Sequence, residues 1–186
     1  MKRILAVTAL ACALVFPIAA AEGPSFAEPI LLTSCGQSAD VLMMKTLLAR
    51  DSLYFAYLPQ ATHADLAGAA SVIIVLGGSS KGLGAAKISE VEETARVTAL
   101  LDSARAHAVP VLAAHMGGLN RRGALSDPFN RLGAAAAARI IVVKGGNDDG
   151  FFTQIASENS ARLDTVDNAL RVGPLVKEIY RPTSSE

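Results

Sequence analysis

The chain has 186 residues, equal numbers of basic and acidic side chains (17 each) and a 51% share of hydrophobic residues. This length is enough for one domain with a real core. The charge balance excludes a strongly basic surface, so we expect neither nucleic acid nor an anionic membrane surface as a partner.

Residues 1–21 have the three regions of a cleavable export signal. Met1–Arg3 is positively charged, residues 4–16 are apolar, and the small residues that follow provide a cleavage site after Ala21 or as late as Ala27. The apolar run is shorter than the roughly 20 residues of a membrane-spanning helix. We therefore expect an exported protein, periplasmic or extracellular, that keeps no transmembrane anchor after processing.

Cleavage of this signal changes the character of the mature chain. It removes two basic residues, which leaves a slightly acidic protein, and it removes Cys12, so that Cys35 becomes a lone thiol without an internal partner. We expect residues 28–181 to form a single α/β domain that relies on its core for stability, followed by a polar tail over residues 182–186.

Apolar runs alternate with helical patterns along the mature chain. The runs that predict strands are residues 29–33, 53–58, 71–76, 111–114 and 140–143. The patterns that predict helices are residues 38–50, 62–66, 89–109, 127–138, 151–161 and 168–180. Continuous apolar strands between helices are typical of a parallel sheet covered on both faces. We therefore predict a three-layer α/β sandwich with a five-stranded parallel sheet, flavodoxin-like, in strand order 2-1-3-4-5.

Glycine and polar residues gather where the carboxyl ends of these strands meet, which is the edge at which open α/β sheets bind ligands. We expect the loops over residues 34–38, 77–82, 115–122 and 145–149 to bind a small polar or anionic molecule. The predicted lining residues are Ser34, Cys35, Gly36, Gln37, Ser38, Gly77, Gly78, Ser79, Lys81, His115, Gly117, Gly118, Arg121 and Asp148. Each also has an ordinary structural explanation, such as a tight turn at a glycine or a helix start at a serine or aspartate.

Several kinds of chemistry can be compared at this edge. Four basic residues on one rim of a slightly acidic protein favour an anion: Lys81, Arg121, Arg122 and Lys144. A metal site would combine His115 with Asp127, Asp148 or Asp149, with Cys35 as a further candidate ligand, but no two of these residues stand at a metal-ligand spacing, so we predict no metal. The spacing of Gly78, Gly82 and Gly84 matches that of short-chain dehydrogenases. It follows the third strand, however, and no tyrosine has a lysine four positions later, so we identify no cofactor.

A thiol-dependent enzyme, either a hydrolase or a redox enzyme, is the alternative to a binding protein. Cys35 follows a strand and precedes a helix, whose N-terminal dipole would favour a thiolate, and His115 is the candidate base. In the predicted strand order one strand separates the two, which places the strand axes about 10 Å apart. A third hypothesis is an accessory subunit of an envelope transporter, with an exposed apolar patch facing its protein partner.

Three segments and the export signal together resemble an uncharacterised family of exported bacterial proteins. The segments are Ser-Cys-Gly-Gln-Ser at 34–38, Leu-Gly-Gly-Ser-Ser-Lys-Gly at 76–82 and His-Met-Gly-Gly at 115–118. The resemblance covers nearly all of the mature chain and implies no activity. The layout is also similar to flavodoxin-like domains, but the segment after the first strand lacks their phosphate-loop pattern, which argues against flavin binding.

Overall fold

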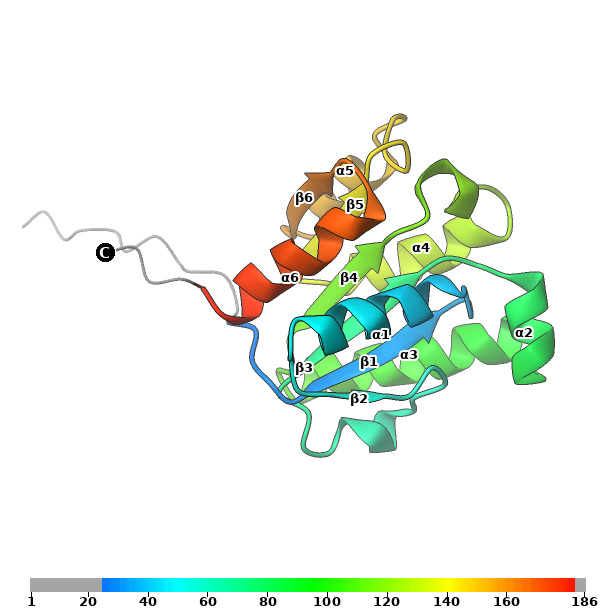
Figure 1. Ribbon diagram of the computed structural model, residues 1–186. Coiled ribbons are helices and arrows are strands. Elements are labelled where there is room, and N and C mark those ends of the chain that lie inside the picture. The colour runs from blue at the N-terminus through cyan, green and yellow to red at the C-terminus, as the bar shows by residue number, and fades with distance from the viewer. Residues whose placement is uncertain (1–24, 183–186) are drawn as a thin grey trace, which may run out of the picture.

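The computed structural model describes residues 25–182 (Figure 1), so the predicted export signal and all but the first residue of the predicted polar tail lie outside the described residues. Within this range the strands are β1 (Ile30–Cys35), β2 (Phe55–Tyr57), β3 (Ser71–Leu76), β4 (Val111–His115), β5 (Arg139–Val143) and β6 (Arg162–Val166). The helices are α1 (Asp40–Arg50), α2 (Ser80–Ala86), α3 (Glu90–Ala106), α4 (Ser126–Ala135), α5 (Phe151–Glu158) and α6 (Val172–Tyr180). Three 3₁₀ turns complete the fold: η1 (His63–Leu66), η2 (Gly118–Arg121) and η3 (Ala169–Arg171).

The molecule is a three-layer α/β sandwich, as predicted. All strand pairs are parallel, in the order β2-β1-β3-β4-β5-β6. Along β3, Val72 and Ile74 pack with buried residues of α3, α4 and α5, whereas Ile73 and Val75 pack with those of α1 and α6. A strand that is buried on both faces has a continuous apolar sequence, which explains why the central strands were predictable.

The predicted number of five strands was wrong, because β6 extends the sheet beyond β5. Its sequence Arg-Leu-Asp-Thr-Val has no continuous apolar run, and its side chains are exposed or half-buried. Pairing with β5 along five residues holds the strand in place. The Arg139 guanidinium also donates to the Asp164 carboxylate across the two strands at 2.6 Å. Such an edge strand carries a weaker sequence signal than the buried strands do.

Helix starts were predicted with mixed success. The helix predicted over residues 89–109 is α3, and a capping box fixes its start: the Ser89 hydroxyl accepts from the Glu92 N–H and the Glu92 carboxylate accepts from the Ser89 N–H. The helix predicted from residue 127 begins at Ser126 as α4, and the Asp127 carboxylate does not cap it but pairs with Arg122. The short helix α2 was not predicted, because two of its seven residues are glycines.

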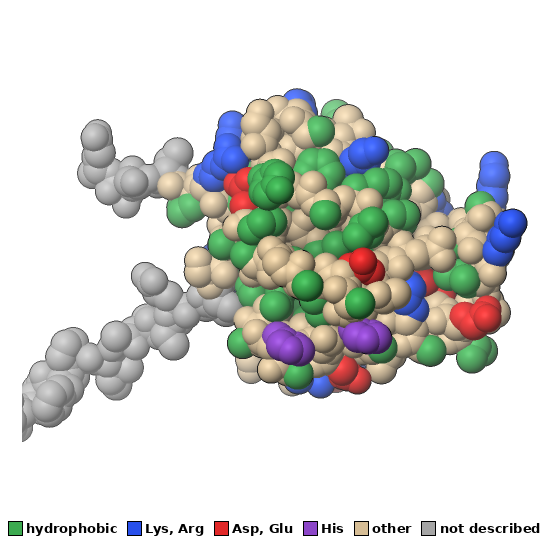
Figure 2. All heavy atoms as spheres, turned by 90° about the horizontal axis from the view of Figure 1, so that it is seen from below, with side chains coloured by type: hydrophobic (Ala, Val, Ile, Leu, Met, Phe, Trp, Pro, Cys, Tyr) green, Lys and Arg blue, Asp and Glu red, His purple; other side chains and the backbone are tan. Residues whose placement is uncertain are grey.

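Charged and apolar side chains share the molecular surface. On the face seen in Figure 2, hydrophobic side chains group in the middle, and most charged side chains of both signs lie around them. Between residues 25 and 182 there is no helix with the length and apolar character that crossing a membrane requires.

Candidate functional site

The loops that follow β1 and β3 are hydrogen-bonded to each other. The Gly77 N–H donates to the Cys35 carbonyl at 3.0 Å. The Ser79 N–H donates to the Gly36 carbonyl at 2.9 Å. These strands flank the point where the strand order reverses, at which open α/β sheets commonly bind ligands. Here the hydrogen-bonded backbones of the two loops occupy that point at the carboxyl edge of the sheet.

Glycines make this close contact between the two loops feasible. A Cβ atom at Gly82 would lie 1.8 Å from the Gln37 carbonyl oxygen, and one at Gly36 would lie 2.6 Å from the Gly77 carbonyl oxygen. Gly36 also has a φ of +96°, which favours glycine. The glycine-rich segments after β1 and β3 therefore have a packing role that requires no ligand.

A buried ion pair forms hydrogen bonds with the loop that follows β1. Glu93 of α3 is fully buried, and its carboxylate accepts from the Gly36 N–H at 2.9 Å and from the Gln37 amide at 3.1 Å. The same carboxylate accepts from the Arg96 guanidinium at 2.7 Å. Arg96 in turn donates to the Ser34 carbonyl at 2.6 Å. The pair thus holds the first residues after β1 in one position.

Sequence reasoning missed Glu93 and Arg96, neither of which it singled out. A signal was present, because Glu93 lies one turn before Val97 on the buried stripe of α3. A carboxylate at such a position needs a buried partner. Arg96 is within reach, three residues further along the same helix.

An open cleft lies beside these loops, between α1, α2 and the end of β2. Its volume is about 450 Å³, within the range of small-molecule sites. Its lining residues are Gln37, Ser38, Ala39, Val41, Leu42, Tyr57, Pro59, Gln60, Ser79, Lys81, Gly82, Ala85 and Ala86. The cleft is thus formed by the residues that follow β1, β2 and β3 at the carboxyl edge of the sheet.

The cleft contains part of the predicted rim. Four predicted residues line it: Gln37, Ser38, Ser79 and Lys81. The other predicted residues do not line it: Ser34, Cys35, Gly36, Gly77, Gly78, His115, Gly117, Gly118, Arg121 and Asp148. Sequence reasoning missed the wall that comes from the end of β2, although Pro59 and Gln60 follow a predicted strand at the same edge.

The four basic residues of the predicted rim differ in their surroundings. Arg121 pairs with Asp40 at 3.0 Å, and Arg122 pairs with Asp127 at 2.7 Å and with another carboxylate at 2.8 Å. Among residues 25–182, neither Lys81 nor Lys144 has a carboxylate within ion-pair distance. Of these two lysines, only Lys81 lines the cleft.

The second carboxylate at Arg122 belongs to Asp149, in the loop after β5. Arg122 also donates to the Gly146 carbonyl at 2.6 Å, and its guanidinium lies 4.2 Å from the centre of the Phe151 ring. These contacts join the loops after β4 and β5 to the starts of α4 and α5. Because its donors are engaged within the protein, Arg122 acts here as a structural clamp.

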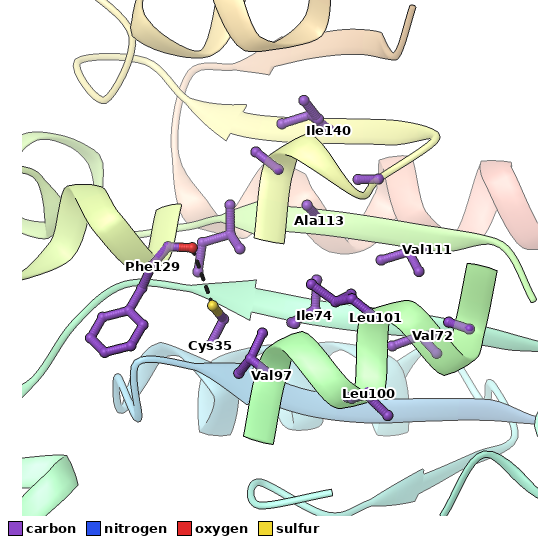
Figure 3. Packing of buried hydrophobic residues seen from close by; sticks show 14 of the residues in the cluster. Cys35, Val72, Ile74, Val97, Leu100, Leu101, Val111, Ala113, Phe129 and Ile140 are labelled. Carbon is purple, nitrogen blue, oxygen red and sulfur yellow. Dashed lines mark hydrogen bonds between the residues drawn. The ribbon is translucent and has the colours of Figure 1, made fainter. Parts of the chain in front are cut away.

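Cys35 is not placed to act as a nucleophile. Its side chain is fully buried on the face that α3 and α4 cover, and the thiol donates to the Phe129 carbonyl at 3.1 Å (Figure 3). Burial, together with the nearby Glu93 carboxylate, raises the pKa of the thiol far above its usual range. The neutral thiol is therefore the stable form, and it does not face the cleft.

His115 is also buried and is separated from Cys35. In the sheet register Leu76 stands between the two residues, opposite both of them. His115 Nε2 donates to the Arg121 carbonyl at 3.0 Å, whereas no group among the described residues bonds to Nδ1. Burial lowers the pKa of the imidazole. The geometry thus gives no pairing of Cys35 with His115 for thiol catalysis.

Within residues 25–182, no three His, Cys, Asp or Glu side chains are grouped so that they could hold a metal ion. Asp127 and Asp149, which were considered as metal ligands, pair with Arg122 instead, and Asp148 lies in the loop that precedes α5.

Strand order and layers define a doubly wound α/β domain with a flavodoxin-like layout and an open cleft at its carboxyl edge. The chain belongs to the family described as "Domain of unknown function (DUF6305)", whose sequence profile matches residues 27–180. This confirms the resemblance to an uncharacterised family. No match was found among curated proteins.

Among solved structures, the chain is similar to AlinE4, an SGNH-hydrolase family esterase, with 14% identity and a TM-score of 0.32. The similarity covers 89% of this chain and 87% of that chain. Two alanine-substituted mutants of the same esterase match over the same shares, with 14% and 13% identity and TM-scores of 0.32 and 0.30.

Proposed function

We propose that this domain is an exported binding protein that holds a small organic anion in the cleft between α1, α2 and the end of β2. The observation that carries the proposal is Lys81. It is an exposed cation on the wall of a concave site, and no carboxylate of the described residues pairs with it. A charge in that position can form a charge-assisted hydrogen bond with an incoming anion.

The base of the cleft is held in place before any ligand arrives. The Gln37 amide donates to the Pro59 carbonyl at 3.1 Å and also to Glu93, so the residues after β1 and β2 are tied together. The Ser79 hydroxyl accepts from the Gly82 N–H and fixes the start of α2. A site that is already ordered loses less conformational entropy on binding.

Calorimetric titration of the mature protein with acetate, other small carboxylates and inorganic phosphate tests the proposal. We expect at least one of these anions to bind, and Lys81→Met to weaken its binding about tenfold or more through loss of a charge-assisted bond. Lys87→Met is the matched control, because Lys87 is an exposed lysine just after α2 that does not line the cleft. Absence of binding by every anion, or equal affinity in the Lys81→Met variant, would contradict the proposal.

A further inference from the structure

We infer that the anion held beside Lys81 carries an apolar chain, so that the ligand class is a singly charged amphiphile such as a medium-chain carboxylate. This inference rests on the proposed function and names the chemistry of its ligand. It follows from the composition of the cleft walls and from the single charge among them.

The walls of the cleft are mainly apolar. The apolar lining residues are Ala39, Val41, Leu42, Tyr57, Pro59, Ala85 and Ala86. Leu42 projects from α1 and is 52% exposed, one of a small number of large hydrophobic side chains that lie open to solvent. Covering such a side chain with an alkyl chain removes apolar surface from water, which is favourable.

The two alanines explain how the cleft stays open. Ala85 and Ala86 form the α2 wall opposite Leu42 and Val41 of α1. Methyl side chains at these positions leave the space between the helices unfilled. A groove with mainly apolar walls and small side chains on one of them suits a flexible hydrocarbon better than a compact polar anion.

The charge of the cleft limits the ligand to a single negative charge. Lys81 is the one charged residue among the lining residues within the described range, and no aspartate or glutamate lines the cleft. The nearest acidic residue in sequence, Asp40 at the start of α1, is already paired with Arg121. The Lys45 ammonium lies 4.8 Å from the centre of the Tyr57 ring, and Lys45 does not line the cleft. A dianion such as phosphate requires two cations to balance its charge, and the cleft provides only Lys81.

The test is a calorimetric series with acetate, butyrate, hexanoate and octanoate at constant ionic strength. We expect the dissociation constant to fall about two- to fourfold for each added methylene, because each buried methylene contributes up to about a fourfold gain in affinity. Octyl glucoside and octylammonium, which have the same chain without the negative charge, should bind at least tenfold more weakly than octanoate.

Two variants test whether the bound alkyl chain lies in the cleft. Ala85→Trp fills the space from an exposed helix position, so the fold should tolerate the substitution while octanoate binding is lost. Lys81→Met should remove the preference for octanoate over octyl glucoside, whereas Lys87→Met should keep it. Circular dichroism of each variant verifies that the domain is folded.

The outcomes separate this inference from the proposed function. If acetate and octanoate bind equally well and Lys81→Met weakens both, the anion site stands and the apolar chain is refuted. If neither the carboxylates nor inorganic phosphate binds, both ideas fail, whereas binding of phosphate alone leaves the anion site standing and refutes the apolar chain. If octyl glucoside binds as tightly as octanoate, the cleft is an apolar surface without an anion site, which also overturns both. Self-association of the wild-type protein that Ala85→Trp abolishes would show that a second copy covers the cleft, contrary to the inference.

Discussion

Glu93 and Arg96 form a charged pair beneath the loop that supplies the base of the cleft. The carboxylate receives hydrogen bonds from the backbone, from the Gln37 amide and from the guanidinium, and Arg96 is only 11% exposed in its side chain. Burying two charges is expensive, and the cost is offset only when each has its partners. The pair is therefore expected to specify the position of the loop more than it adds to stability.

The Glu93→Gln variant should destabilise the domain by about 3–5 kcal/mol, because it leaves the Arg96 guanidinium buried without a carboxylate. Urea denaturation followed by circular dichroism measures this change. Glu90→Gln, at an exposed position in the first turn of the same helix, is the control and should change the free energy of unfolding by less than about 1 kcal/mol. A Glu93→Gln variant as stable as the control would show that loss of the carboxylate does not destabilise the domain, contrary to this prediction.

The buried His115 makes the stability of the domain depend on pH. Burial lowers the pKa of its imidazole in the folded protein, while the unfolded chain keeps a pKa near 6.5. The unfolded state therefore binds a proton first as the pH falls, and the free energy of unfolding decreases below about pH 6.5 until the folded pKa is reached. Stability from this residue is fully present above pH 7 and is lost on acidification.

Urea denaturation at a series of pH values between 7.5 and 5 measures the effect. His115→Gln should flatten the acid side of the profile, since glutamine does not titrate, even if the variant is less stable at every pH. His63→Gln, at an exposed position in η1, should keep the wild-type profile. An unchanged slope in the His115→Gln variant would assign the pH dependence to other groups.

At the scale of whole elements, α2 is positioned by its contact with the loop after β1. Gly82 and Gly84 lie in the same short helix and have different surroundings. A Cβ at Gly82 would overlap the Gln37 carbonyl, while one at Gly84 would meet no atom within 4 Å. The two glycines therefore provide a matched pair of substitutions.

Gly82→Ala should destabilise the domain by about 1–3 kcal/mol, because α2 must move away from the loop to admit the methyl group. The same shift should weaken anion binding, since α2 carries one wall of the cleft. Gly84→Ala should stabilise the domain by up to about 1 kcal/mol, as alanine favours the helix. Thermal unfolding of both variants tests the pair, and equal destabilisation by the two substitutions would contradict the packing role of Gly82.

The elements differ in how well the sequence could predict them. β1, β3, β4 and β5 are buried on both faces, so a continuous apolar run identifies each of them. β6 lies at the edge of the sheet and is stabilised by pairing with β5, which leaves no such run. α2 depends on contacts with a distant loop that outweigh its poor helix propensity.

The same distinction applies to the candidate site. Gln37 and Lys81 could be predicted, because polar residues after parallel strands lie at one edge of the sheet. The sequence could not show that backbone contacts fill the centre of this edge, since those contacts depend on how closely the loops after β1 and β3 approach each other. It also could not show which arginines pair internally, because the Arg121–Asp40 partners are 81 residues apart in the chain.

At the scale of the whole molecule, the proposed function depends on where the protein works, and residues 1–21 predict export. A cell that makes the full chain with a C-terminal tag should release a mature form that begins at Glu22, or at Glu28 if the later site is used. Fractionation should place this form outside the cytoplasm, and N-terminal sequencing identifies the cleavage site.

Replacing Ala19 and Ala21 with leucine removes the small side chains that signal peptidase requires at the first site. This change should leave a longer, membrane-associated precursor or shift cleavage to Ala27. Recovery of the wild-type chain at full length in the cytoplasm would refute export, and the anion bound in the cleft would then be a cytoplasmic one.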